Sequence, residues 1–161
     1  MSERHPMTEP GYRKLLEELK ELKKVERPKA SKAIEIAREH GDLKENAEYH
    51  AAKEHQGMLE SRITHLEVVT SLAEVIDISK LSGEKVMFGA TVLIEDVDTG
   101  DSKTVIIVGE EEADVNKGHI SYKSPVARAL IGRNLDDIAK VNLPGGAKEY
   151  EIREVSFKGV S

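Results

Sequence analysis

The sequence predicts an α+β protein of two parts: an N-terminal antiparallel helical hairpin, then a small domain with a mostly antiparallel sheet and a short helix. Apolar residues recur at spacings of three and four over most of the first 76 residues, which is the period of an amphipathic helix. From about Lys85 the chain is rich in β-branched residues between turn signals, which favours strands. The 161 residues suffice for one ordinary domain or two small ones.

The first predicted helix begins at Thr8, which can act as its N-cap. Glu9 and Pro10 then occupy the first turn, where both residue types are favoured. Pro28 interrupts the run, and because an interior proline costs a helix about 3 kcal/mol, we expect a kink there. The apolar positions of this helix are Leu15, Leu16, Leu19, Leu22, Val25, Ala30, Ala33, Ile34 and Ala37.

A second apolar stripe follows after a short turn. Because so short a connection joins the two stripes, they must face each other in an antiparallel hairpin. One narrow apolar seam on each helix is typical of a two-helix coiled coil. Helices of about thirty residues, at about 1.5 Å each, give an arm about 45 Å long. The second stripe consists of Ala47, Ala51, Leu59, Ile63, Leu66, Val69, Ala73 and Ile76.

The second predicted domain alternates strands and turns. "KVMFGATVLIEDV" and "KTVIIVG" predict strands, and "DTGD" between them is a turn signal. "SPVARALIGR" predicts a short helix with Ser124 as its N-cap and Pro125 at the first helical position. "AKVNLPGGAKEYEIREVSF" predicts two strands joined by a Pro-Gly-Gly turn.

The segment "DISKLSGE" loses the helical period and separates the two parts. We therefore expect a coiled-coil hairpin over residues 1–77 with its tip at 41–45, a linker over 78–84 and a C-terminal domain over 85–161.

Composition excludes several kinds of site. The chain has no cysteine, so it has neither a disulfide framework nor a cysteine-based zinc site. Its 24 basic and 30 acidic residues give a net charge of -6, and neither half carries the basic excess of an autonomous nucleic-acid binder. "MSERHPMTEP" lacks the apolar core of a signal peptide, and no later run is long enough to span a membrane. A cytoplasmic protein with no membrane partner is expected.

The stretch "EHGDLKENAEYH" lies at the turn between the predicted helices and can be interpreted in two ways. In the first, its residues only end one helix and begin the next. Gly41 is placed as a left-handed C-terminal cap. Asp42 is then the N-cap of the second helix, and Glu45 at the third position completes a variant of the capping box.

In the second interpretation, Asp42, Glu45 and Glu48 form half of a metal site. A hairpin tip is the point most remote from the body of the protein, and carboxylate oxygens suit hard cations such as Mg²⁺. One or two carboxylates make a poor site alone but would contribute to a site that another molecule completes. His40 adjoins these acids and could help to shape the tip.

The same stretch, extended to "GDLKENAEYHAAKEHQG", closely resembles the hairpin tip of the bacterial Gre transcript cleavage factors. "MTEPGYRKLLEEL" resembles the start of that family, "FGATV" its first sheet strand and "SPVARALIG" its C-terminal helix region, so nearly the whole chain is covered in the family's order. The resemblance implies a C-terminal domain of FKBP-like fold. With Phe88 and Phe157 as its only phenylalanines and no tryptophan, the chain could hardly line a prolyl isomerase pocket, and we expect no such activity.

The resemblance further implies a transcription elongation factor. Such a factor binds backtracked bacterial RNA polymerase, inserts its hairpin into the secondary channel and stimulates the polymerase's own Mg²⁺-dependent cleavage of the nascent RNA 3′ end. It is not an enzyme alone, because it lends carboxylates to the polymerase active site. We expect a monomer that binds no cofactor stably and shares Mg²⁺ with the polymerase. DNA binding is implied within the transcription complex only.

Individual residues match the family's motif. Asp42 and Glu45 match its two acidic tip positions, which implies metal and water positioning by these carboxylates. Arg38 and Lys53 match basic positions near the extruded RNA, although lysine replaces the more usual arginine at residue 53; a solvated helix face is the alternative for both. The residues that the resemblance assigns to tip architecture are Gly41, Asn46, Glu48 and Tyr49.

In the second domain the loop "SYKSP" matches a region that contacts polymerase at the channel mouth. This match assigns polymerase binding to Ser121, Ser124 and Pro125, with helix capping as the alternative for the last two. Lys123 departs from the acidic or amide residue common at its position.

The sequence leaves three alternative functions open. A Gre-like protein can occupy the channel and inhibit, although the tips of such proteins depart from the two-acid pattern kept here. A non-catalytic coiled-coil scaffold would use Asp42 only as a helix cap. A free-standing metal-dependent nuclease would need more ligands than the hairpin offers.

Overall fold

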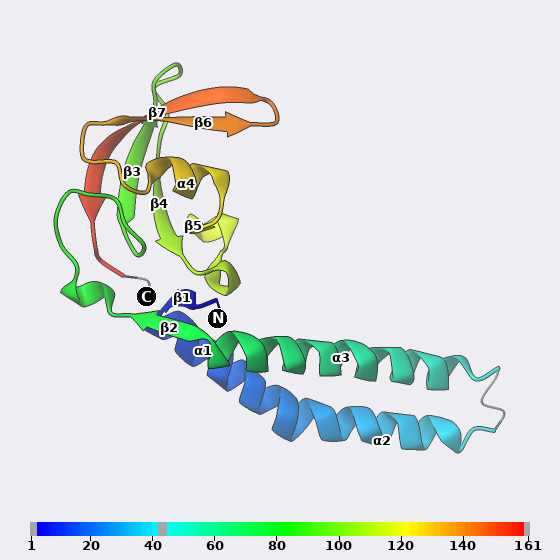
Figure 1. Cartoon of the computed structure of the whole chain (residues 1–161). Coiled ribbons are helices and arrows are strands. Elements are labelled where there is room, and N and C mark those ends of the chain that lie inside the picture. The colour runs from blue at the N-terminus through cyan, green and yellow to red at the C-terminus, as the bar shows by residue number, and fades with distance from the viewer. Residues whose placement is uncertain (1–2, 42–44, 160–161) are drawn as a thin grey trace. The chain divides into compact units, whose positions relative to one another are not determined.

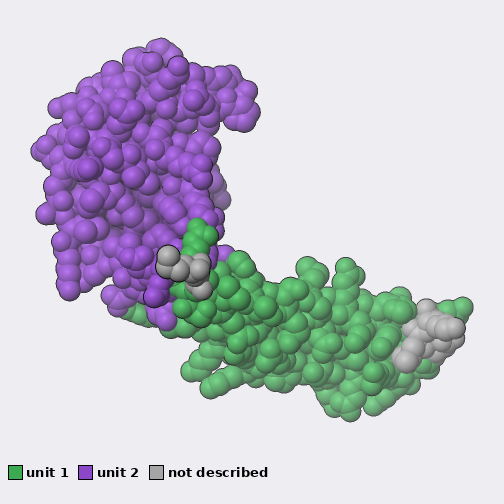
Figure 2. Space-filling model, in the orientation of Figure 1, with its two compact units in different colours: residues 1–3, 13–72 green, residues 4–12, 73–161 purple. Residues whose placement is uncertain are grey.

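The computed structural model describes residues 3–41 and 45–159, which form two compact units (Figures 1 and 2). Arg13–Leu72 belong to the first unit, and Arg4–Tyr12 join the described residues after Leu72 in the second. The predicted α+β class is confirmed. The helices are α1 (Glu9–Glu21), α2 (Arg27–Arg38), α3 (Ala47–Ser71) and α4 (Pro125–Leu130), and the strands are β1 (His5–Thr8), β2 (Ala73–Ile76), β3 (Thr91–Asp96), β4 (Ser102–Val108), β5 (His119–Ser121), β6 (Ile138–Leu143) and β7 (Gly146–Ser156).

The first unit is the predicted helical hairpin, in which α2 packs antiparallel to α3 along one apolar seam (Figure 1). Ala30 faces Leu59 and Ile63 in the buried cluster, with Leu19 and Leu22 packed against its edge. The exposed positions of these helices are mostly charged or polar, with Leu16, Ile36, Met58 and Val68 among the apolar exceptions. The periodicity in the sequence therefore identified most of the buried positions, but the predicted stripe members Leu16, Ala33, Ala47 and Ala51 are exposed.

Ion pairs flank this seam on the surface. Arg27 reaches Glu60 through two nitrogen–oxygen contacts of 3.0 Å each, and Arg62 reaches Glu18 at 2.8 and 3.0 Å. A third pair joins Lys23 to Glu67 at 3.0 Å. All these side chains are about 40–50% exposed, so each pair contributes at most about 1 kcal/mol.

The interruption predicted at Pro28 takes the form of a π-helical turn over Leu22–Glu26. The Arg27 N–H donates to the carbonyl of Leu22, five residues earlier. Helix α2 then starts at Arg27, which places Pro28 in its first turn. Proline has no N–H to donate to the carbonyl four residues earlier, and its ring crowds that carbonyl, so a departure from regular α-helix just before it is expected.

The end of the second helix differs from the prediction. Ala73 and Ile76 were expected to continue the helical stripe, but α3 ends at Ser71, and both residues lie in strand β2. Strand β2 pairs in parallel with β1, from His5 opposite Ala73 to Thr8 opposite Ile76. The β-branched Val75 and Ile76 suit a strand, and the partner strand lies 68 residues earlier by that register.

The second unit contains a curled five-stranded sheet in the order β5-β4-β3-β7-β6. Three neighbouring pairs are antiparallel, and β4 with β5 is parallel. Ser124 caps α4 as predicted, accepting a hydrogen bond from the Ala127 N–H at 3.3 Å. The strands predicted around the Pro-Gly-Gly turn are β6 and β7.

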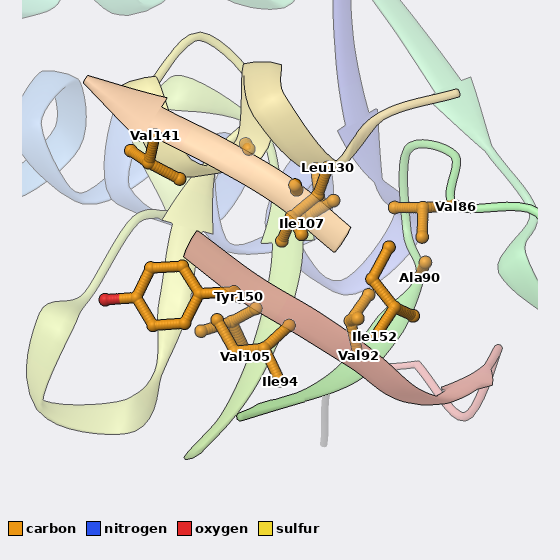
Figure 3. Packing of buried hydrophobic residues seen from close by; sticks show 12 residues of the cluster. Val86, Ala90, Val92, Ile94, Val105, Ile107, Leu130, Val141, Tyr150 and Ile152 are labelled. Atoms are coloured by element: carbon orange, nitrogen blue, oxygen red, sulfur yellow. The ribbon is translucent and has the colours of Figure 1, made fainter. Parts of the chain in front are cut away.

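The core of the second unit lies between the sheet and α4 (Figure 3). Leu130 of α4 is fully buried in the same cluster as Ile94, Ile107 and Ile152 of the sheet. Alternate residues of β3, such as Val92 and Ile94, point into this cluster, as expected for a sheet with one buried face.

The start of α1 is joined to this unit by Glu112. Thr8 caps α1 as predicted, because its hydroxyl accepts from the Gly11 N–H at 3.1 Å. The same hydroxyl donates to the Glu112 carboxylate, which also accepts from the N–H groups of Thr8 at 3.0 Å and Gly109 at 2.8 Å. Glu112 lies 104 residues after Thr8, so this anchor was not predictable from local sequence.

Candidate functional site at the hairpin tip

The tip begins where α2 ends. The N–H groups of Glu39 and His40 donate to the carbonyls of Ile36 and Ala37, each at 3.2 Å, which tightens the last turn. Gly41 follows with a φ of +110°, a positive value that glycine adopts without strain. Gly41 therefore has the positive φ that the sequence predicts, although the C-cap of α2 is Glu39, two residues earlier.

Helix α3 begins later than predicted. Its N-cap is Asn46, whose side-chain oxygen accepts from the Tyr49 N–H at 3.0 Å. The expectation that the helix is capped at residue 42, with Glu45 at its third position, was therefore wrong: Glu45 precedes the helix. Asparagine caps a helix as well as aspartate does, and at residue 46 it gains a second partner. Asp42 itself lies outside the described residues.

That second partner belongs to the other helix. The Asn46 Nδ2 donates to the carbonyl of Ala37 at 2.6 Å. One side chain thus satisfies a backbone group at the end of α2 and another at the start of α3. The preference of Asn for N-caps could have located the helix start from the sequence, but no local pattern signals the bond to Ala37.

The acidic residues of the described tip face solvent. Glu45 and Glu48 are both exposed, and they line an open hollow together with His40, Asn46 and Ala47. The His40 Nε2 lies 3.8 Å from a carboxylate oxygen of Glu48. Glu48 lies in the first turn of α3, where the helix dipole favours a negative charge.

Arg38, the last residue of α2, contacts an aromatic ring at the start of α3. Its guanidinium carbon lies 6.0 Å from the ring centre of Tyr49, and the Tyr49 ring meets the His50 ring edge-on at 5.6 Å. Lys53 is exposed one turn further along α3. Arg38 is therefore held near the turn by an aromatic contact, within the reach typical of cation–π pairs.

The described donors fit a shared cation site better than an independent one. Within residues 3–41 and 45–159, no group of three or more His, Asp or Glu side chains is placed to hold a metal ion. Exposed carboxylates such as those of Glu45 and Glu48 do suit Mg²⁺, which is commonly held by one or two carboxylates together with water and phosphate oxygens. Further ligands beyond these two carboxylates would be needed to complete such a site.

Comparison with known families decides what kind of protein carries this tip. Residues 5–75 match the family described as transcription elongation factor, N-terminal, and residues 81–157 match the C-terminal family of GreA/GreB. The chain belongs to the GreA/GreB transcription elongation factor family. Within the Gre factors it is most like GreA.

Individual relatives of this Gre factor match over nearly their full length. Transcription elongation factor GreA of Rhizobium etli is 56% identical over 98% of this chain and 99% of its own. GreA of Hyphomonas neptunium is 58% identical over 97% of this chain and 99% of its own. Among solved structures, GreA factor homolog 1 of Thermus thermophilus is 28% identical over 95% of this chain and 99% of that chain, with a TM-score of 0.45.

The three predicted polymerase contacts of the Gre-like loop lie between the end of β5 and the start of α4: Ser121, Ser124 and Pro125. The Ser124 N–H donates to the carbonyl of Ser121 at 2.9 Å, and the Ser121 hydroxyl accepts from the Lys123 N–H at 3.1 Å. Pro125 is exposed at the first position of α4. The Lys123 ammonium pairs with Glu110 at 3.2 Å and lies 5.8 Å from the Tyr122 ring centre, so its charge is partly offset within the protein.

Within the part of the chain that the structure describes, no helix of this Gre factor is long and apolar enough to cross a membrane.

Proposed function

We propose that this Gre factor inserts its hairpin into the secondary channel of bacterial RNA polymerase and stimulates cleavage of the backtracked RNA 3′ end. The observation that carries the proposal is the tip itself. Its described carboxylates are exposed at the turn of a long hairpin, beside a hollow, and too few in number to hold a metal alone. Such a tip suits a reaction in which a partner supplies further ligands.

In this proposal Glu45 and Asp42 are the residues that touch the reacting groups. Both would hold the Mg²⁺ that is shared with the polymerase and orient the attacking water. The ion, when bound, supplies charge stabilisation for the attacking and leaving oxygens of phosphoryl transfer. The factor alone would be no nuclease, and a stably bound cofactor is not part of the proposal.

The flanking residues provide the contacts that bring the tip into place. Arg38 and Lys53 would contact phosphates of the extruded RNA, since both are exposed basic groups on the hairpin near the turn. Ser121, Ser124 and Pro125 would contact polymerase at the channel mouth. The protein would act as a monomer in the cytoplasm, because one hairpin is enough to fill one channel.

The test uses a halted, backtracked bacterial polymerase complex with labelled RNA and Mg²⁺. Wild-type protein is compared with the double variant Asp42→Ala/Glu45→Ala, and a binding assay confirms that both bind polymerase. The proposal expects faster cleavage with wild type and none of that acceleration with the bound, folded variant. Binding without acceleration by wild type would instead identify a channel-occupying inhibitor. Absence of polymerase binding would favour a scaffold.

A further inference from the structure

Asn46 makes two hydrogen bonds in opposite directions. Its Nδ2 donates to the Ala37 carbonyl at 2.6 Å, and its Oδ1 accepts from the Tyr49 N–H at 3.0 Å. The partners fix the orientation of the amide, because a carbonyl can only accept and a backbone N–H can only donate. The side chain therefore joins the last turn of α2 to the first turn of α3.

The residue of α2 that Asn46 contacts, Ala37, belongs to the packed seam. Ala37 is only 2% exposed, and its carbonyl also accepts from the His40 N–H at 3.2 Å, so both of its lone pairs are used. The bond from Asn46 thus links the start of α3 to a backbone group that the hairpin core already holds in place. A short segment containing the tip lies between the two linked residues.

Glu45 directly precedes the tethered residue. Its side chain is exposed, so packing does not set its direction. The backbone at Asn46 is extended, with φ of -85° and ψ of 97°, and this conformation is held by the two amide bonds. The direction in which Glu45 leaves the chain therefore depends on the tether.

We propose that Asn46 is a positioning residue that presents the Glu45 carboxylate for transcript cleavage, an inference that rests on the proposed function. Only an amide of this length meets both partners. Aspartate would still cap α3 but has no donor for the Ala37 carbonyl. A carboxylate that is misplaced by about 1 Å loses on the order of a hundredfold in rate.

The test is Asn46→Asp, with Ile63→Val as the matched control. Ile63 lies in the hairpin core, and its truncation lowers hairpin stability by about 0.5–1.5 kcal/mol without touching the tether. Cleavage is measured against factor concentration in the backtracked complex. We expect Asn46→Asp to lower the maximal rate about ten- to a hundredfold at an unchanged half-saturating concentration, whereas Ile63→Val keeps the wild-type maximal rate.

A second experiment distinguishes a positioning role of Asn46 from general damage to the hairpin. In a Glu45→Gln background, Asn46→Asp should cost little more, because residues that act as a unit are not additive. If the double variant instead loses the product of the two single-variant reductions in maximal cleavage rate, the inference is overturned. If Asn46→Asp does not fold, Asn46→Ser, which keeps a capping acceptor, replaces it.

The outcomes also separate this inference from the proposed function. A wild-type protein that binds polymerase without accelerating cleavage would overturn both. If wild type accelerates cleavage and the Asn46→Asp variant reaches the same maximal rate, only the positioning role of Asn46 is overturned.

Discussion

The Glu112 carboxylate occupies the space where a side chain on Gly11 would lie. A Cβ at Gly11 would overlap that carboxylate, which accepts the Thr8 N–H at 3.0 Å. In a capping box, the third residue of the helix supplies the acid that accepts the N-cap N–H. Here Thr8 is the N-cap and Gly11 is that third residue, so a glutamate from a distant part of the chain takes the acid's place.

This relationship predicts an unusual response to Gly11→Ala. Alanine is favoured over glycine in helices by up to about 1 kcal/mol, yet the substitution should destabilise the wild-type protein because the Glu112 side chain must leave its partners. In a Glu112→Ala background, the same substitution should stabilise instead. Urea unfolding of the four proteins gives the coupling, and additive effects would contradict the arrangement.

Glu112→Gln should lower the free energy of unfolding by about 1–3 kcal/mol, because an amide cannot accept all the hydrogen bonds that the carboxylate accepts. The neighbouring Glu110→Gln serves as a control. Glu110 makes only a partly exposed pair with Lys123, and its loss should cost at most about 1 kcal/mol. Equal losses for the two variants would rule out a special role for Glu112.

The tip geometry predicts different stabilities for two neighbouring substitutions. Asn46→Ala removes an N-cap and should cost about 0.5–2 kcal/mol. Glu45→Gln should stay within about 0.5 kcal/mol of wild type, because Glu45 is exposed and precedes the helix. Denaturant unfolding of both variants checks this. A larger loss for Glu45→Gln would restore the capping role that the sequence suggested.

The hairpin seam predicts a contrast between two isoleucines. Ile63 is 1% exposed and Ile36 is 46% exposed, although both lie in helices of the hairpin. Ile63→Ala should cost about 2–5 kcal/mol, and Ile36→Ala should cost less than about 1 kcal/mol. Thermal and urea unfolding followed by helical circular dichroism measures both. Similar costs would mean that the seam lies on a different face.

The hydrogen bonds of Asp96 with the loop between β3 and β4 predict that the stability of the protein falls at acid pH. Its buried carboxylate accepts the Asp98 N–H at 2.9 Å. This bond, helped by the Thr99 N–H and Lys148, holds the pKa of Asp96 below its ordinary value of 3.8, although burial opposes the shift. A lowered folded pKa stabilises the protein above the unfolded value, and that stability is lost as pH falls through the folded pKa.

Asp96→Asn should therefore destabilise the protein at neutral pH, and its difference from wild type should shrink below about pH 4. The exposed Asp98→Asn is the control, since Asp98 contributes its backbone N–H to this network. Unfolding measured from pH 7 to pH 2.5 gives the comparison. A difference that stays constant across this range would contradict the assigned ionisation.

The sequence predicted features that depend on local pattern. The three-and-four spacing identified the seam through Ala30, Leu59 and Ile63, and the residue preferences at Thr8 and Ser124 identified two helix caps. These succeed because a cap or an amphipathic face is specified by residues within a few turns of each other.

Features that depend on distant partners were not predicted. Ala73 and Ile76 fit a helical stripe but lie in a strand, and only pairing with β1 decides between the two structures. At the tip, asparagine and aspartate are equivalent caps by preference, and the bond from Asn46 to Ala37 decides where α3 begins. Tertiary contacts thus overrode local preference at both ends of α3.

The parallel pairing of β1 and β2 also bears on the order in which the chain folds during synthesis. Parallel strands need a crossover connection, and here the whole hairpin is that crossover, because β1 precedes it and β2 follows it. The hairpin seam is complete once residue 72 has been made. The Thr8 cap must wait for Glu112, and β3 must wait for β7 near the C-terminus. The arm should therefore form on the ribosome before the sheet of the second unit is complete.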